Sequence, residues 1–133
     1  MKISELMAGD VETLDRNDTL SLAEDLMKMK RLRHLPVMED GRLAGVISQR
    51  DLFHAGLSTA MGFGTKAKGE FLKAVLVKEI MTEEVITIGS SAEVKEAART
   101  MLKKKIGCLP VVDGGELVGL ISESDIIRVV AEG

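Results

Sequence analysis

The 133-residue sequence has no tryptophan and no tyrosine, which leaves three phenylalanines as its only large rings. Proteins that bind single-stranded nucleic acid stack the bases on aromatic side chains, and this chain offers few of them. Its net charge of -3 also argues against a general nucleic-acid binder, because such proteins neutralise phosphates with a basic surface. Nucleic acid is therefore not an expected partner.

The sequence also lacks a long apolar run and a second cysteine. No stretch of about 18 apolar residues is present to span a membrane, and the opening MKISELMAGD has no apolar core of a secretory signal. The single cysteine, Cys108, cannot close an internal disulfide, which is typical of a reducing compartment. We therefore expect a cytoplasmic protein without a membrane segment.

Patterns for metal binding and catalysis are missing as well. His34 and His54 are the only histidines, and no cysteine or acid stands at a familiar ligand spacing with them. No base can be assigned to Cys108, so a small buried packing residue is favoured over a nucleophile. We expect neither a metal site nor an enzyme.

What the sequence does contain is a repeat. A shift of 74 residues, without a gap, aligns residues 5–54 with 79–128 and gives 16 identities among 50 pairs. The stretch GVISQRD at 45–51 returns as GLISESD at 119–125. We therefore divide the chain into repeat 1 at residues 1–57, a linker with a short helix at 58–78, and repeat 2 at 79–133.

Each repeat predicts the order strand, helix, strand, strand, helix. A short β-type run at 11–14 or 85–88 precedes a helix with apolar residues at helical spacing. These apolar residues are Leu20, Ala23, Leu26 and Met27 in repeat 1, and Val94, Ala97, Ala98, Met101 and Leu102 in repeat 2. Two apolar runs then flank Asp40-Gly41 or Gly114-Gly115, pairs that accept the positive φ of a hairpin turn, and a last helix begins around Ser48 or Ser122.

Three further expectations concern the helix ends, the linker and the core. Ser90 and Glu93 fit a capping box for the first helix of repeat 2. In the linker, glycines at 62, 64 and 69 predict a loop, and apolar residues at 71, 72, 75 and 76 predict a short helix. Because about 50 residues is marginal for an independent core, we expect the repeats to share one core in a pseudo-twofold α+β unit.

The S-x-x-D stretch after the second hairpin strand has two interpretations. In the first, Ser48 with Asp51, and Ser122 with Asp125, are capping boxes and nothing more. In the second, the helix N-terminus offers N–H groups to a phosphate, while the aspartate accepts hydrogen bonds from the adjacent hydroxyls of a ribose. The glycine that opens the stretch then leaves room for a ligand or for a neighbouring backbone.

The doubled combination of E-[LI]-M, V-x-T, LPV, a glycine hairpin and G-h-I-S-x-x-D resembles a tandem pair of cystathionine β-synthase (CBS) domains, over about 100 of the 133 residues. The resemblance implies a Bateman module, in which two β-α-β-β-α repeats pack into one unit. It implies regulation rather than catalysis, with AMP, ADP, ATP or S-adenosylmethionine bound in clefts between the repeats. It also implies a homodimer, with the signal read by the dimer interface or by a regulated partner protein.

The same resemblance places ligand contacts in both repeats. Phosphate and ribose would contact Ser48, Asp51, Ser122 and Asp125, with Thr13 and Thr87 nearby. The segment around Leu-Pro would contact adenine and phosphate, through Arg33, His34, Leu35 and Pro36 in repeat 1 and Gly107, Cys108, Leu109 and Pro110 in repeat 2. Arginine can clamp a phosphate and glycine cannot, so we expect anionic ligands to prefer the neighbourhood of Arg33 and His34.

The sequence supports two hypotheses about function, which belong to different functional classes. The first is a free-standing sensor module for an adenosine-containing ligand. The second is a dimerising scaffold without a small-molecule ligand, in which the S-x-x-D turns act only as helix caps.

Overall fold

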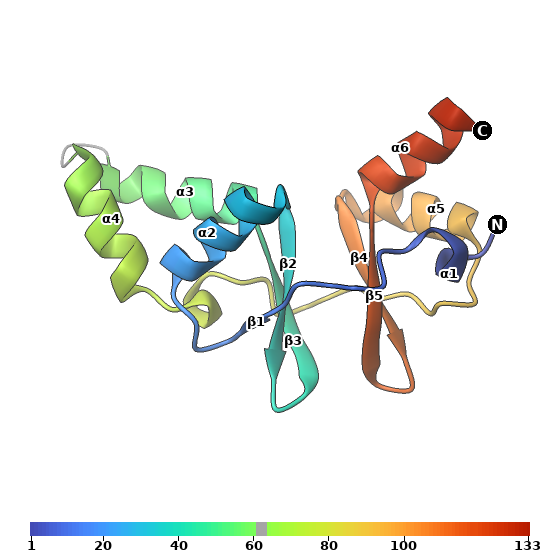
Figure 1. The fold of residues 1–133 in the computed structure, drawn as a ribbon, viewed down its shortest axis with the longest axis horizontal. Coiled ribbons are helices and arrows are strands. Elements are labelled where there is room, and N and C mark those ends of the chain that lie inside the picture. Colours follow the sequence, from blue (N-terminus) through green and yellow to red (C-terminus); the bar gives the residue numbers. More distant parts are fainter. Residues whose placement is uncertain (61–63) are drawn as a thin grey trace. The chain divides into compact units, whose positions relative to one another are not determined.

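The computed structural model describes residues 1–60 and 64–133, which fall into two compact units (Figure 1). Unit 1 comprises Met1–Val11 and Val85–Gly133, and unit 2 comprises Glu12–Glu84. The expected α+β class is confirmed, because each unit combines helices with a small sheet. None of the helices in these described ranges is long and apolar enough to cross a membrane.

The sheet of unit 2 has the order β1, β2, β3. β1 (Leu14–Asp15) runs parallel to β2 (His34–Glu39), which pairs antiparallel with β3 (Arg42–Ser48). The hairpin turn has φ of 50° at Asp40 and 78° at Gly41, so both central residues adopt the left-handed conformation that the sequence predicts. The turn, together with a register shift between the pairs Met38–Leu43 and Val37–Gly45, sets the last residues of β3 against the first residues of β2.

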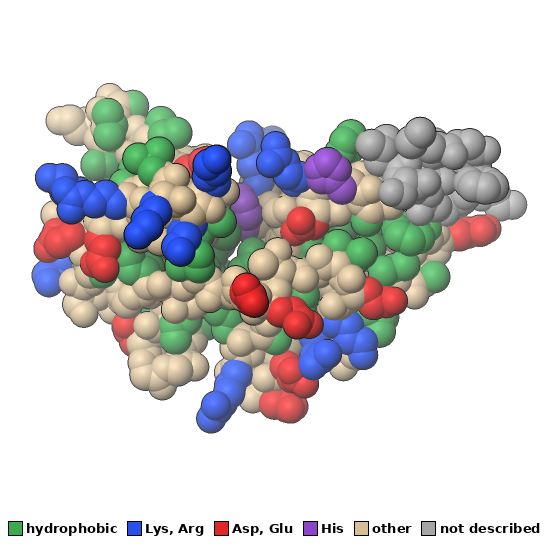
Figure 2. Space-filling model, turned by 180° about the vertical axis from the view of Figure 1, so that it is seen from behind, with side chains coloured by type: hydrophobic (Ala, Val, Ile, Leu, Met, Phe, Trp, Pro, Cys, Tyr) green, Lys and Arg blue, Asp and Glu red, His purple; other side chains and the backbone are tan. Residues whose placement is uncertain are grey.

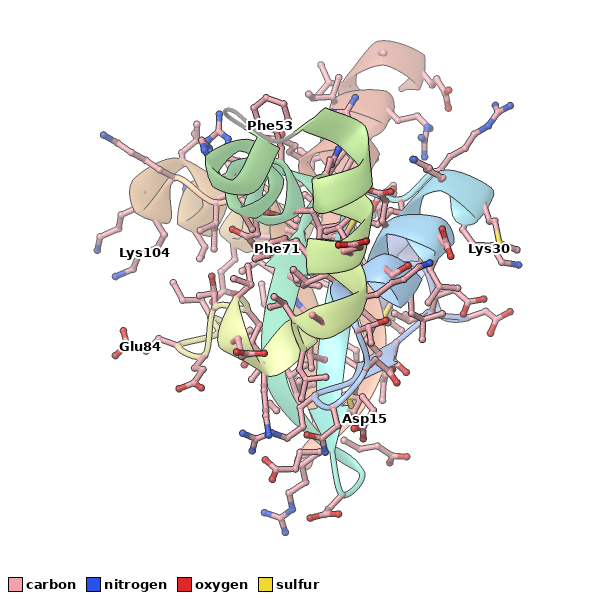
Figure 3. All side chains as sticks on the ribbon, turned by 90° about the vertical axis from the view of Figure 1, so that its left-hand side faces the viewer. Asp15, Lys30, Phe53, Phe71, Glu84 and Lys104 are labelled. Carbon is pink, nitrogen blue, oxygen red and sulfur yellow. The ribbon has the colours of Figure 1, made fainter. Side chains whose placement is uncertain are left out.

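Helices cover the sheet of unit 2. They are α2 (Leu20–Lys30), α3 (Gln49–Ala60) and α4 (Gly64–Ala74), followed by the 3-10 turn η1 (Val77–Glu79). Their apolar faces and the sheet enclose one cluster of buried side chains. Phe71 packs against this cluster, whereas Phe53 is 62% exposed and lies at the outer side of the helices (Figure 3).

Unit 1 repeats the plan with a shorter sheet. Its elements are α1 (Ile3–Leu6), α5 (Val94–Lys104), the antiparallel pair β4 (Cys108–Asp113) and β5 (Glu116–Ser122), and α6 (Glu123–Glu132). The glycines of the β4–β5 turn have φ of 57° and 82°, as the sequence predicts. A second cluster of buried side chains lies inside this unit, so each unit encloses a core of its own.

Several local expectations are also corrected. The run at 85–88 forms only a parallel bridge between Ile88 and Val111, and the strand expected at 11–14 is the two-residue β1. Leu102 is 81% exposed rather than part of the core, because Met101 and Ala97 already fill the buried face of α5. The linker is more helical than expected, since α3 and α4 together span all of it from 58 to 74 except 61–63, and Gly62 lies outside the described residues.

The capping box expected for α5 does not form. The N-cap of α5 is Glu93, whose side chain makes no capping bond. Ser90 instead donates its backbone N–H, at 3.0 Å, and its hydroxyl to the carboxylate of Asp113 at the end of β4. These hydrogen bonds lower the pKa of Asp113. The sequence could not reveal this partner, because it stands 23 residues away.

The leading segment of repeat 1 belongs to unit 1, together with repeat 2. Ile3 is fully buried in the core of unit 1 and donates its N–H to the carbonyl of Ala92 at 2.9 Å. Ala8 and Leu120 exchange two backbone hydrogen bonds of 3.1 Å, which extends the free edge of β5. The residues at 1–11 therefore complete the unit that contains repeat 2.

The chain segment at 77–84, which joins the end of the linker to the start of repeat 2, does the same for unit 2. Val77 is fully buried there and donates its N–H to the carbonyl of Asp18 at 2.7 Å. Val46 of β3 and Thr82 exchange hydrogen bonds of 3.1 and 2.9 Å. The compact units and the sequence repeats are thus different divisions of the chain.

Gly45 and Gly119 stand where these leading segments cross the sheets. A Cβ at Gly45 would lie 2.7 Å from Met81 Sδ and 2.8 Å from the carbonyl oxygen of Thr82. At Gly119 it would lie 2.5 Å from Met7 Sδ. Of the two roles that the sequence allows for this glycine, the structure gives it the close approach of a neighbouring chain segment.

Alanine at Gly45 or at Gly119 is expected to lower the free energy of unfolding by about 1–3 kcal/mol, the usual cost of overpacking a core. Urea unfolding followed by circular dichroism measures this change. The matched control is Gly9→Ala, because nothing lies within 4 Å of a Cβ at that position. A Gly45→Ala protein as stable as the Gly9→Ala protein would contradict the tight crossing.

Candidate ligand site at the two strand-to-helix turns

The same hydrogen-bonded turn ends the hairpin of both units. In unit 2, Asp51 Oδ2 accepts the backbone N–H of Ser48 at 2.8 Å, and Ser48 Oγ accepts the N–H of Asp51 at 3.0 Å. In unit 1, the corresponding bonds between Ser122 and Asp125 measure 2.8 and 3.3 Å. Both capping boxes that the sequence predicts are therefore present, at the N-termini of α3 and α6.

The capping bonds do not use every hydrogen-bond acceptor at each turn. An ionised carboxylate has about four acceptor sites. The backbone N–H of Ser48 takes one at Asp51, whereas Asp125 accepts the N–H of Ser122, the Ser122 hydroxyl at 3.0 Å and Arg128 Nη1 at 3.5 Å. The side chains of Asp51 and Asp125 are partly buried, which holds them in place while still open to solvent. The N–H groups of the first and third residues of each helix are already bonded, to the carbonyl of Arg33 or Gly107 and to the cap serine, so the first turn adds mainly the positive end of the helix dipole. Hydroxyls and anions are the groups that such a turn can bind.

The hairpin register of unit 2 brings Arg33 and His34 to its turn. His34 is paired directly with Ser48, and the backbone N–H of Gln49 donates to the carbonyl of Arg33 at 2.7 Å. Arg33 is exposed and His34 is half-buried. Four of the predicted contact residues therefore lie together. They are Arg33 and His34 at the start of the hairpin, and Ser48 and Asp51 at the cap of α3.

Unit 1 builds the same arrangement with different side chains. Cys108 is paired with Ser122, and the N–H of Glu123 donates to the carbonyl of Gly107 at 2.9 Å. Burial, and secondarily the negative charge of Glu123, raises the pKa of the Cys108 thiol to about 12. The thiol is thus held protonated at neutral pH, and Cys108 is the buried packing residue that the sequence favours.

The other predicted contact residues are divided between surface and core. Thr13 and Thr87 are exposed and precede the residues that pair with β2 and β4. Buried side chains, by contrast, are found at Leu35, Pro36, Leu109 and Pro110. Proline has no N–H to donate, and the carbonyl of Pro110 already accepts the N–H of Ile88 at 3.1 Å. Contact between these four residues and a ligand remains a prediction.

Charge distinguishes the two turns. Beside the cap of unit 2 stand two exposed arginines, Arg33 and Arg50, with the acid Asp51. Beside the cap of unit 1 stand Glu123 and Asp125, and Arg128 lies 3.5 Å from Asp125 Oδ1. Sequence reasoning missed Glu123, although the 74-residue shift pairs it with the neutral Gln49. Figure 2 shows acidic and basic side chains exposed at the surface.

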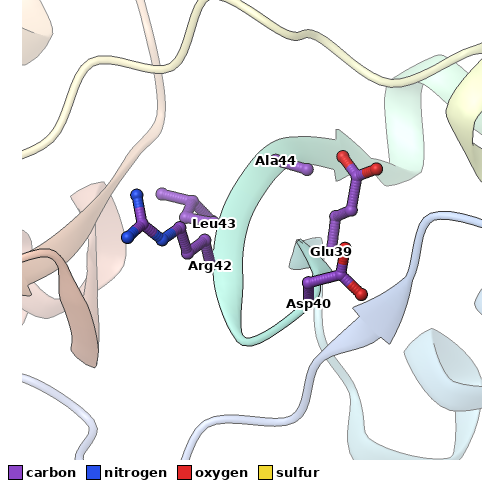
Figure 4. A pocket seen from close by; sticks show the side chains of 5 residues that line it. All are labelled: Glu39, Asp40, Arg42, Leu43 and Ala44. Atoms are coloured by element: carbon purple, nitrogen blue, oxygen red, sulfur yellow. The ribbon is translucent and has the colours of Figure 1, made fainter.

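A separate hollow of about 370 Å³ lies at the β2–β3 hairpin and is lined by Glu39, Asp40, Arg42, Leu43 and Ala44 (Figure 4). Glu39 is already held by Arg16, whose Nη1 lies 2.7 Å from its carboxylate. Figure 4 shows Arg42 on the opposite side of the hairpin from the two acids, so these charges do not converge on a common centre. No cluster of three metal-ligating side chains occurs in the part of the chain that the structure describes.

Comparison with known proteins extends to sequence and to structure. The sequence model of the CBS domain matches residues 3–58 and 77–132. A CBS domain-containing protein of Dictyostelium discoideum is 32% identical over 127 residues, which cover 94% of this chain and 88% of that protein. Inosine-5′-monophosphate dehydrogenase of Korarchaeum cryptofilum is 33% identical over 118 residues, but the matched 88% of this chain covers only 22% of that enzyme.

Among solved structures, this chain superimposes on the CBS domain pair of protein MJ0100 with a TM-score of 0.81. That structure is a complex with 5′-methylthioadenosine and S-adenosyl-L-methionine. It is 25% identical, and the match covers 99% of this chain and 97% of that one. Two family matches fill most of the sequence, and the fold agrees with a solved pair. The chain therefore belongs to the CBS domain family and carries two CBS domains in tandem.

Proposed function

We propose that the chain is a regulatory module that binds an adenosine-containing ligand, such as AMP, ADP, ATP or S-adenosylmethionine, at its strand-to-helix turns. Binding is passed on to a dimer interface or to a regulated partner protein. The observation that carries this proposal is the doubled turn, in which a partly buried aspartate and a helix N-terminus stand beside the first residues of the preceding hairpin strand. The adenosyl ligands of the MJ0100 pair support it.

The groups at the turn suit the ribose and the phosphate of a nucleotide. The aspartate accepts hydrogen bonds from the two ribose hydroxyls, and the positive end of the helix dipole attracts a 5′ phosphate. In unit 2, Arg33 adds a planar guanidinium that can form two parallel hydrogen bonds with phosphate. Adenine rests against aliphatic side chains, since the chain contains no tryptophan and no tyrosine.

A scaffold without a ligand is the second candidate, and one observation favours it. Both serine–aspartate pairs already form complete capping boxes, so helix stability alone accounts for these residues. In that case the doubled turn would reflect the repetition of a stable fold.

Direct binding separates the two candidates. Calorimetry on nucleotide-free protein with AMP, ADP, ATP, NAD and S-adenosylmethionine is expected to detect at least one adenosyl ligand. The same ligand at 100 times its Kd raises the free energy of unfolding by about 2.7 kcal/mol, which a thermal-shift assay detects. Absence of binding by every member of this panel would favour the scaffold.

Arg33→Ala is expected to weaken the binding of AMP or ATP by about tenfold or more, because a hydrogen bond to a charged group is worth about 1.5–3 kcal/mol and each 1.4 kcal/mol is a factor of ten. Adenosine, which has no phosphate, should bind the variant as it binds the parent protein. Arg31→Ala is the matched control, since Arg31 is also exposed and lies two residues away. Unchanged AMP affinity in Arg33→Ala, with loss of binding in Asp125→Ala, would contradict the assignment of phosphate to unit 2.

We further propose that the chain forms a homodimer through α6. Ile127 and Val130 are 64% and 81% exposed and stand three residues apart on one helical face. Val130→Asp should shift the protein, by light scattering, from twice the chain mass of 14.4 kDa to the monomer. Leu102→Asp is the matched control, because Leu102 is also 81% exposed and lies on another helix of the same unit. A parent protein that is monomeric at high concentration would refute the dimer.

A further inference from the structure

The two turns differ at a position that directly follows the cap serine. Gln49 and Glu123 each donate a backbone N–H to the residue that precedes the hairpin strand, at 2.7 and 2.9 Å. Both side chains are exposed at the first residue of their helix. Their backbone geometry is therefore shared, and the carboxylate of Glu123 is the difference.

The charges that surround Glu123 do not cancel it. In the described part of unit 1, Arg128 is the one basic side chain that forms an ion pair at this turn, and its partner is Asp125. Gly107 and Cys108 supply no cation where unit 2 has Arg33 and His34. Ser124 likewise replaces Arg50. The turn of unit 1 therefore carries one uncompensated negative charge.

That charge lies where a phosphate would bind. An acid in the first turn interacts favourably with the positive end of the helix dipole. The negative charge of Glu123 therefore already makes the interaction that an anionic ligand would make there. Its influence reaches the hairpin strand, because it contributes to the raised pKa of Cys108. A phosphate at this N-terminus would face a like charge, whereas a cation would be attracted.

We propose that the turn of unit 1 selects adenosine derivatives whose 5′ group is neutral or cationic, and that Glu123 is the residue that excludes phosphate. This inference rests on the proposed function and assigns the two turns to different ligand classes. Unit 2 takes phosphorylated adenosine through Arg33. Unit 1 takes a nucleoside with a sulfonium or thioether group, because Gly107 supplies no cation there and Glu123 supplies a negative charge.

The repeat itself supplies the experiment. Asp51→Ala removes the ribose contact of unit 2, so that calorimetry on this full-length variant measures unit 1. AMP, adenosine and S-adenosylmethionine are the probes, because they share adenosine and differ in 5′ charge. We expect adenosine and S-adenosylmethionine to bind and AMP to bind more weakly. Adding Glu123→Gln should raise AMP affinity about three- to tenfold, lower that of S-adenosylmethionine and leave adenosine unchanged.

The reciprocal change tests unit 2. In an Asp125→Ala background, Gln49→Glu should lower AMP affinity by a similar factor and leave adenosine unchanged. Raising the salt concentration should shrink both effects, because exposed charges are screened. Glu116→Gln is the control for lost negative charge, since Glu116 lies at the opposite end of β5 from the turn. Circular dichroism checks that each variant is folded.

The outcomes separate this inference from the proposed function. If the parent protein binds none of the probes, the proposed function fails. If the parent binds but the Asp51→Ala variant binds neither adenosine nor S-adenosylmethionine, the assignment of unit 1 fails and unit 2 keeps the function. An AMP-to-adenosine affinity ratio that Glu123→Gln leaves unchanged, or that Glu116→Gln changes equally, would overturn the role of Glu123.

Discussion

Each compact unit depends on a chain segment that comes from outside its own repeat. The segment at 1–11 closes the unit of repeat 2, and the segment that starts at Val77 closes the unit of repeat 1. Ile3 and Val77 are fully buried in the two cores, and burial of such a side chain is worth about 1.5–3 kcal/mol. Neither repeat contains a complete core without this exchange, which explains why a repeat of about 50 residues need not be stable alone.

The exchange also gives the repeated pattern of each turn a structural meaning. The glycine of G-h-I-S-x-x-D makes room for a methionine of the crossing segment, Met81 or Met7. The space beside the glycine is therefore filled by the protein itself. The serine and the aspartate cap the following helix. Three residues of the doubled stretch thus have structural roles, and ligand binding must use the acceptor capacity that the caps leave. A stable cap also holds the aspartate in a fixed position, so the two roles are compatible.

Similarity between the repeats lies in the backbone, and difference lies in the charges placed on it. Strand register, turn geometry and capping bonds are shared by both units. On this common frame, Arg33 is exchanged for Gly107 and Gln49 for Glu123. Because the frame is constant, the chain provides internal controls for each substitution. Two turns of opposite charge would allow one protein to respond to two kinds of adenosyl ligand, with the response set by the differential affinity of each ligand for the available conformations.

The sequence by itself determined the repeat. It also determined the hairpins, the helices at Leu20–Lys30 and Val94–Lys104 and the two S-x-x-D capping boxes, because these depend on residues close together in the chain. It could not place Ser90 against Asp113, the exposed Leu102, or the crossing of Met81 over Gly45. These contacts join residues that are distant in sequence, and only tertiary packing decides which of them meet. The exchange of leading segments belongs to the same class, since local propensity is identical whichever sheet a segment completes.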